Sequence, residues 1–305
     1  MTTATLIEIL KVGNELGEGV IWDAIGSAVW WTDIDGQVLY KYHPSDGSIV
    51  QWATPERLGS FARIADSDYL ICAFESGFAY FDPLTSDLQW LHKIDSNNGN
   101  IRLNDGRADR QGRFWAGSMV EDKQQRGVEA ERAGALYCLD RRLNCVSKLA
   151  GLTISNGLCW SPDNTYLYHT DTPSRRINRY DFERSSGAIS NQMTLLQTES
   201  GCFPDGSTID AQGYLWNAQW GGSQVVRYSP NGSVDFVLPL PVSQPTCVAF
   251  GGAQLNLLFI TSARQGLSAA ALESEPDAGN VFVFETNVSG IQDPVFEPIF
   301  PINRL

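Results

Sequence analysis

Residues 17–32 read GEGVIWDAIGSAVWWT, and this stretch contains the unit from which the rest of the chain is built. A short run of β-type residues, 19–22, leads into a turn at 23–26, and a stronger run, 28–32, follows it. Asp at the first turn position and Gly at the fourth favour a type I turn. The β-branched and aromatic residues on both sides favour strands. The stretch therefore predicts a hairpin, which a third run at 37–42 extends into a small antiparallel sheet.

The same unit recurs along the chain. Clear copies surround the turns at 109–112, 161–164 and 210–213, and two weaker copies span residues 61–82 and 245–285. Six copies with four strands each, spaced by roughly 40–50 residues, are typical of a β-propeller. We therefore predict an all-β fold, a six-bladed β-propeller with four antiparallel strands per blade, as a single domain over residues 1–305. The apolar stretch 6–10 is expected to pair with the last blade and close the ring, which would cover an exposed sheet edge.

Four copies carry a polar residue five positions before the turn: Glu18, Asn104, Asn156 and Asp205. In a ring these side chains would converge on one axis from separate blades. They offer only oxygen donors, two of them carboxylates, which suit a hard or borderline divalent cation. Asn-Gly and Pro-Asp-Gly are ordinary turn sequences when taken singly, but four such residues at one position of the repeat indicate a site.

The remaining positions around this axis are less polar. The two weaker copies have Phe61 and Pro245 at the corresponding place, so one side of the site is expected to be apolar. Arg102 and Asn104 should lie on the same side of an extended segment, with Arg102 either a surface charge or a substrate anchor. Asp105 is expected to be structural and to buttress its turn.

Glu121 follows the second strand of the third copy. It is either a solvated loop acid or part of the site. The strongly polar insertion after it, residues 122–133, is long enough to form a lid over one end of the channel.

Composition narrows the class of protein further. A formal net charge of -13 over 305 residues disfavours nucleic acid as a partner. No apolar run approaches the length of a membrane span, and Glu8 and Lys11 interrupt the only apolar stretch near the N-terminus, so we expect no signal peptide. Six cysteines without a C-x-x-C pair favour free thiols in a cytoplasmic protein. The sequence leaves the oligomeric state open.

Other catalytic chemistries lack their residues. The chain has no G-x-S-x-G elbow and no Walker or G-x-G-x-x-G loop. Its three histidines, at 43, 92 and 169, are too few and too scattered for a His-based triad or a His-rich zinc site.

Taken together, these motifs resemble the senescence marker protein/gluconolactonase/luciferin-regenerating enzyme family, which includes regucalcin. The resemblance covers nearly the whole chain. It rests on GEG at 17–19 with Trp22, RLNDG at 102–106, GRFWAGSM at 112–119, SNGL at 155–158 with SPD at 161–163, and PDG at 204–206.

The resemblance implies a six-bladed propeller with one divalent metal ion and activity as a sugar lactonase of the gluconolactonase type. It implies the following roles: metal ligands Glu18, Asn156 and Asp205; substrate contacts Arg102, Asn104 and Glu121, with Asn104 also a possible ligand. Asp205 is in addition our candidate general base. Oxygen ligation permits Ca, Mg, Mn, Zn or Fe(II), and neither the metal nor the sugar follows from the sequence.

Three alternatives stay open at this stage. One is a phosphotriesterase or a hydrolase of lipophilic lactones on the same scaffold. The second is a non-catalytic binding propeller, since WWTD at 30–33 and YHTD at 168–171 are similar to the YWTD repeats of receptor propellers. The third is calcium handling without catalysis.

Overall fold

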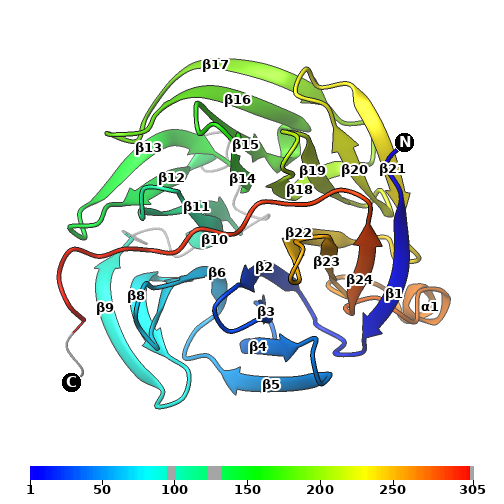
Figure 1. The fold of residues 1–305 in the computed structure, drawn as a ribbon, viewed down its shortest axis with the longest axis horizontal. Helices are drawn as coiled ribbons and strands as arrows, with labels where there is room; N and C mark the ends of the chain where they lie inside the picture. Colours follow the sequence, from blue (N-terminus) through cyan, green and yellow to red (C-terminus); the bar gives the residue numbers. More distant parts are fainter. Residues whose placement is uncertain (95–100, 122–131, 303–305) are drawn as a thin grey trace.

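The computed structural model describes residues 1–94, 101–121 and 132–302. The strands of these residues form six four-stranded sheets arranged as blades around a central axis (Figure 1). The predicted six-bladed propeller of antiparallel strands is therefore confirmed.

The blades follow one another along the chain, and each is written from its inner to its outer strand. The strands are, in blade I, β2 (Gly17–Asp23), β3 (Ala28–Asp33), β4 (Val38–His43) and β5 (Ser48–Ala53); in blade II, β6 (Leu58–Arg63), β7 (Leu70–Phe74), β8 (Gly77–Asp82) and β9 (Asp87–Lys93); and in blade III, β10 (Ile101–Ala108), β11 (Phe114–Val120), β12 (Gly134–Leu139) and β13 (Cys145–Leu152).

The second half repeats this order. The strands are, in blade IV, β14 (Ser155–Trp160), β15 (Tyr166–Asp171), β16 (Arg176–Glu183) and β17 (Ala188–Gln197); in blade V, β18 (Phe203–Ile209), β19 (Leu215–Trp220), β20 (Gln224–Tyr228) and β21 (Val234–Pro239); and in blade VI, β22 (Pro245–Gly251), β23 (Leu257–Ser262), β24 (Val281–Thr286) and β1 (Ala4–Leu10).

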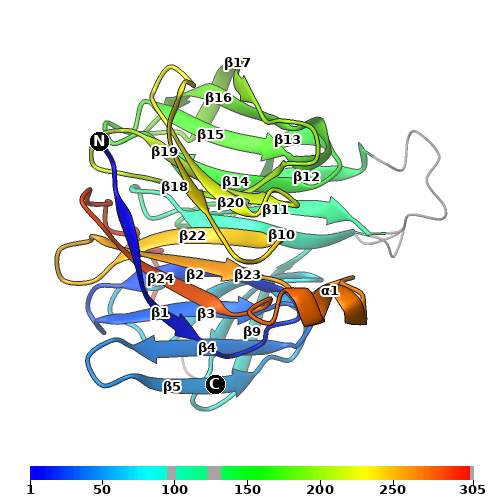
Figure 2. The same cartoon turned by 90° about the vertical axis from the view of Figure 1, so that its right-hand side faces the viewer.

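The ring is closed by its own N-terminus. β1 pairs antiparallel with β24, with Leu6 opposite Phe284 and Leu10 opposite Val281. The predicted closure by residues 6–10 is therefore confirmed, and Figure 2 shows β1 running along the outside of the last blade. The pairing covers an edge of β24 that would otherwise be open to another strand.

The predicted turns are tied by their aspartates. Oδ1 of Asp109 accepts hydrogen bonds from the backbone N–H groups of residues 111 and 113, and Oδ1 of Asp210 does the same for residues 212 and 214. Their second oxygens accept the indole N–H of Trp115 at 2.8 Å and of Trp216 at 3.0 Å. Each Asp thus joins its turn to the following strand, which explains why Asp and Trp recur together in the repeat.

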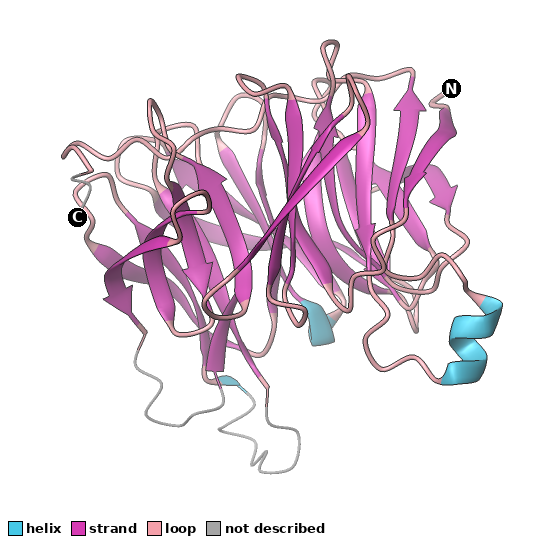
Figure 3. Ribbon diagram, turned by 90° about the horizontal axis from the view of Figure 1, so that it is seen from below, coloured by secondary structure: helices cyan, strands magenta, loops and turns pink. Residues whose placement is uncertain are grey.

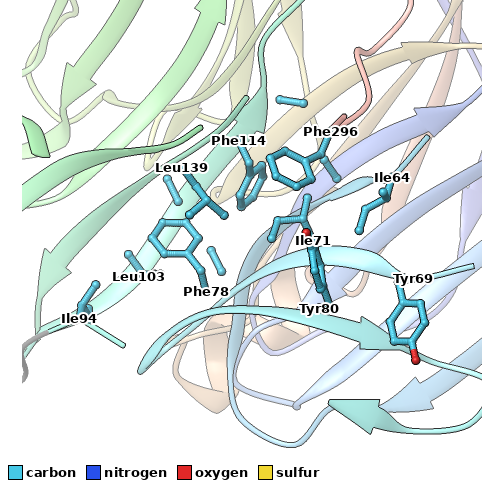
Figure 4. Packing of buried hydrophobic residues seen from close by; sticks show 14 residues of the cluster. Ile64, Tyr69, Ile71, Phe78, Tyr80, Ile94, Leu103, Phe114, Leu139 and Phe296 are labelled. Carbon is cyan, nitrogen blue, oxygen red and sulfur yellow. The ribbon is translucent and has the colours of Figure 1, made fainter. Parts of the chain in front are cut away.

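Aromatic and aliphatic side chains fill the spaces between blades. Figure 4 shows the cluster between blades II and III, where Phe78 meets Phe114 and Phe296 lies beside Tyr80. Phe296 comes from the C-terminal segment, residues 287–302, which crosses the middle of the ring at one end of the channel (Figure 1). Backbone hydrogen bonds to Arg63 and Ala65 fix this segment to blade II.

The opposite end of the channel carries the first residues of the inner strands. The short 3-10 helix η2 (Thr172–Ser174) and the helix α1 (Ala269–Ser274) lie on this face (Figure 3). No helix within the three described ranges is long and apolar enough to cross a membrane.

Candidate active site

The inner strands that carry predicted ligands are interrupted by β-bulges at those ligands. In β2, pairing with β3 stops after Glu18 and resumes at Ile21; in β14 it stops after Asn156. The next residues, Gly19 and Gly157, have φ values of 59° and 66°, a left-handed backbone that favours glycine. Bulges bend a strand and re-aim its side chains, so the glycines that flank both ligands serve to turn them towards the axis.

Asn104 and Asp205 reach the axis by a slightly different route. The last paired residues before their bulges are Leu103 and Pro204, so Asn104 and Asp205 are themselves the first residues of the bulge. All four polar residues lie five positions before their turns. Glu18 and Asn156 are still paired with the neighbouring strand, whereas Asn104 and Asp205 lie one residue beyond the last pair. The bulges accommodate this one-residue difference in strand pairing.

The four predicted axial residues are buried, and direct contacts join two of them. Glu18 and Asp205 are 6% and 5% exposed. The amide Nδ2 of Asn104 donates to Oδ1 of Asn156 at 2.8 Å, which bridges blades III and IV. The structure therefore brings the predicted residues of four blades to one end of the channel.

The pKa values of the two carboxylic acids of this group, Glu18 and Asp205, are both raised. Burial, with a further contribution from the charge of Asp105, raises the pKa of Glu18 to about 8. Burial and the neighbouring charges of Glu18 and Asp105 raise the pKa of Asp205 well above its usual value. Three carboxylic acids thus share one buried space, and the positive charge of Arg102 lowers both pKa values only in part.

One oxygen of this group has no hydrogen-bond partner among the described residues. Oδ1 of Asp205 is fully buried and unpaired there, whereas Oε2 of Glu18 accepts the N–H of Gly19 at 3.1 Å. A buried carboxylate oxygen without a donor is costly, and a divalent cation would satisfy it. The described residues contain no cluster of three His, Cys, Asp or Glu side chains that could hold a metal, so a cation bound here would need other oxygen donors, such as an amide, beside these two carboxylates.

The amide of Asn156 is held in the orientation that would let its oxygen serve as a donor to a cation. Its Nδ2 donates to Oγ1 of Thr172 at 2.9 Å, and that hydroxyl donates to the carbonyl of Pro204 at 2.9 Å. Because the threonine proton is used, its oxygen must accept from the asparagine, which directs Oδ1 of Asn156 away from η2. No motif of the repeat points to Thr172.

The predicted substrate contacts form a chain of hydrogen bonds beside the acids. Nη1 of Arg102 donates to Oδ1 of Asn104 at 2.7 Å, and its Nε donates to Glu121 at 3.1 Å. Arg102 is 4% exposed, so its interpretation as a surface charge is wrong. Glu121 is not a free loop acid either, because it is paired with two arginines. Residues 122–131 of the expected lid lie outside the described residues.

Arg57 belongs to this network, although no sequence motif points to it. It directly precedes β6, and its two terminal nitrogens donate to the two oxygens of Glu121 at 2.7 and 2.8 Å. Its Nε donates to Glu75. Arg57 lies outside the repeat motif, in the connection to a blade that supplies no predicted ligand, so the repeat pattern gave no signal for it.

The predicted position of Phe61, in blade II, is wrong. Phe61 does not line the channel; it is fully buried in the core between blades I and II, in one cluster with Ile21 and Trp30. Ser60 takes the place near the axis, and its hydroxyl donates to the carbonyl of Asn104 at 2.8 Å. This side of the site is therefore more polar than expected.

Asp105 also acts differently from the prediction. Its Oδ2 accepts the backbone N–H of Leu158 at 3.1 Å, so it connects β10 to β14 instead of its own turn. Further along β10, the buried Arg107 lies 2.7 Å from Asp293 of the C-terminal segment. Neither contact was expected, since both join residues that are remote in the sequence.

A buried Ser–His pair lies behind the site. Oγ of Ser155 and Nε2 of His169 are 2.7 Å apart. Both residues are at most 1% exposed. A Cβ on Gly117 would come within 1.8 Å of the serine oxygen, so this oxygen is covered by β11. The pair thus supports Asn156 from behind and offers no accessible nucleophile.

The chain is similar to known proteins over most of its length. The family model described as the SMP-30/gluconolactonase/LRE-like region matches residues 16–264. The chain is 37% identical to the L-arabinolactonase of Azospirillum brasilense, over 91% of each protein. It is 34% identical to the 6-deoxy-6-sulfogluconolactonase of Pseudomonas putida, over 96% of this chain and 98% of the relative.

A solved structure agrees with these sequence relatives. The crystal structure of a calcium-binding protein, regucalcin, from Agrobacterium tumefaciens superposes with a TM-score of 0.88 at 28% identity, over 95% of this chain and 97% of the other. The resemblance found in the sequence motifs is thereby confirmed: the chain belongs to the SMP-30/gluconolactonase/LRE-like family.

Proposed function

We propose that the protein is a metal-dependent hydrolase that opens sugar lactones to aldonic acids. One observation carries the proposal: Glu18 and Asp205 lie buried at the end of the channel with a carboxylate oxygen for which the described part of the chain offers no donor. Relatives named as lactonases cover more than nine-tenths of the chain and support the reaction class.

The ligands in this proposal are Glu18, Asn156 and Asp205. Two carboxylates and an amide oxygen suit a hard or borderline divalent cation, and the regucalcin neighbour, described as calcium-binding, supports calcium among the candidates. When bound, the cation supplies Lewis acidity at the lactone carbonyl and charge opposite the developing oxyanion.

Asp205 has the role of general base. With its unpaired Oδ1 given to the cation, the Asp205 carboxylate accepts a proton from the attacking water on its other oxygen, while the water oxygen bonds to the lactone carbonyl carbon. The ring C–O bond then breaks, and the proton held by Asp205 passes to the departing ring oxygen. The product carries a carboxyl group and a new hydroxyl group, so atoms and charge balance.

Arg102, Asn104 and Glu121 bind the substrate. Glu121 and Asn104 accept hydrogen bonds from sugar hydroxyls, and Arg102 donates to lactone and hydroxyl oxygens. Asn104 in addition holds Asn156 in place. This polar mouth favours hydroxylated substrates over lipophilic lactones and phosphotriesters.

The experiment is a pH-indicator assay of lactone opening with glucono-, xylono-, arabinono- and galactonolactone, in each candidate metal and in chelator. Proton release that is lost in chelator and restored by metal is the expected result. Metal binding without turnover of any lactone would contradict the hydrolase and favour calcium handling, which the same carboxylates would also permit.

We also infer a cytoplasmic location. All six cysteines lack a disulfide partner, and four of them are buried, which suits a reducing compartment.

A further inference from the structure

Arg57 differs from the other residues around the site because it contacts no predicted ligand and yet organises a predicted substrate contact. It holds both oxygens of Glu121, at 2.7 and 2.8 Å, in a bidentate pair. Such fork-to-fork geometry fixes orientation as well as distance. The same carboxylate also accepts from Nε of Arg102 at 3.1 Å.

Arg57 is itself fixed from two further sides. Its Nε donates to Glu75. Asp35 lies 3.9 Å from its Nη1 and accepts the amide of Gln265. The backbone N–H of Glu75 donates to the carbonyl of Arg57 at 2.8 Å. Three acids from blades I, II and III thus meet one guanidinium.

The surroundings of Arg57 and Glu121 suit substrate recognition as well as stabilisation of the fold. The side chains of Arg57 and Glu121 are 28% and 31% exposed, whereas that of Arg102 is 5% exposed. A pair at this depth adds little to stability, but its exposed part can meet a ligand. Burial acts to raise the pKa of Glu121, yet hydrogen bonds from Arg57 and the charge of Arg102 lower it below its usual value. Glu121 is therefore an ionised acceptor at neutral pH.

We propose that Arg57 is a positioning residue that sets the preference of the site for hydroxylated lactones by holding the Glu121 carboxylate in place. Each carboxylate oxygen has two acceptor directions, and the contacts within the described residues leave one on Oε2 free. A sugar hydroxyl donates to it, and Arg102 donates to the adjacent hydroxyl oxygen. Without Arg57 the glutamate would take several rotamers, and this recognition would weaken.

The inference rests on the proposed lactonase function, and its test compares two lactones. D-Glucono-1,5-lactone carries hydroxyls, whereas γ-butyrolactone carries none. We expect Arg57→Met to raise KM for gluconolactone roughly tenfold, the size of a lost charged hydrogen bond, with little change in kcat. For γ-butyrolactone, kcat/KM should be unchanged. Arg57→Lys should restore part of the loss.

A double-mutant cycle tests whether Arg57 acts through its partner. Glu121→Gln should raise KM for gluconolactone similarly, and adding Arg57→Met to it should cause almost no further change. Effects that multiply in the double variant, or an equal loss with both lactones, would overturn the inference.

Arg63 provides a matched control. It ends the strand that Arg57 precedes, its side chain is 22% exposed, and it pairs with Asp23 at 3.3 Å at the other end of the channel. Arg63→Met should leave KM for both lactones unchanged. Thermal shifts with Mn²⁺ should be the same in Arg57→Met as in the wild type, since Arg57 contacts no metal ligand.

The two proposals fail in different ways. If the wild type opens neither lactone in any metal, the proposed function and this inference both fall. If the wild type opens gluconolactone and Arg57→Met matches it in KM, the inference alone falls.

Discussion

Buried charged groups are arranged differently at the two ends of the central channel: acids lie together at one end, and an ion pair lies at the other. At the site end, Glu18 and Asp205 lie close to Asp105, and one oxygen of Asp205 has no partner. At the far end, Arg107 and Asp293 form an ion pair at 2.7 Å, with side chains 7% and 11% exposed. Asp293 belongs to the C-terminal segment, which crosses this end of the channel (Figure 1).

The far end is not empty, but its charges are matched. A cavity of about 250 Å³ lies there, lined by Trp22, Arg63 and Asp293 among others. Asp293 accepts the backbone N–H of Trp22 at 2.9 Å in addition to its pair with Arg107. Acids crowded together without a matching cation mark the end where chemistry is expected, whereas the paired charges of Arg107 and Asp293 mark the end that holds the ring together, although Nε of Arg107 has no hydrogen-bond partner among the described residues.

The largest effect should come from Asp205→Asn. We expect lactone hydrolysis to fall by roughly a thousandfold, because the base and a ligand are lost together. The metal-free protein should nevertheless gain in free energy of unfolding, since an acid whose pKa is raised by burial destabilises the fold at neutral pH. Proton-release kinetics and chemical denaturation measure the two effects. Near-normal turnover would contradict the role of Asp205.

Metal should stabilise the site end only. At a concentration of a hundred times Kd, a divalent cation should add about 2.7 kcal/mol to the stability of the wild type. Differential scanning fluorimetry, with and without chelator, reports this as a rise in Tm. Asp205→Asn should abolish the rise, whereas Asp293→Asn should retain it. A rise that survives Asp205→Asn would place the cation elsewhere.

Asp293→Asn should reverse the pattern of the first variant. It leaves the buried Arg107 without its anion, which costs about 3 kcal/mol when one partner of a buried pair is removed. Denaturant unfolding should show this loss while kcat for lactone opening stays close to that of the wild type at 25 °C. A large loss of kcat in a variant that remains folded would show that the two ends are coupled.

The smallest effect concerns pH. Burial lowers the pKa of His169 to about 4, so the native state keeps this ring neutral while the unfolded chain binds a proton below about pH 6.5. Stability should therefore fall as the pH drops from about 6.5 towards 4, and this contribution should level off below that range. His169→Gln should make the fall shallower in urea titrations across this range, and an unchanged slope would exclude the contribution.

The repeat made much of the fold and of the candidate site predictable. Turn aspartates, strand runs and polar residues at a fixed distance all act within one blade, so local sequence contains them. Glu18, Asn104, Asn156 and Asp205 were found in this way. The residues that were missed or misassigned act between blades: Arg57 reaches Glu121, and the others lie in contacts that only the closed ring creates. These are Asp105, Arg107, Thr172 and Phe61.

We propose that one divalent cation binds between Glu18, Asn156 and Asp205. Anomalous diffraction from crystals soaked in Mn²⁺ would locate this cation. We expect a single strong peak within bonding distance of one oxygen of each of the three side chains, and no peak in crystals of Asp205→Asn. A peak at the Asp293 end, or none among these three residues at saturating Mn²⁺, would contradict it.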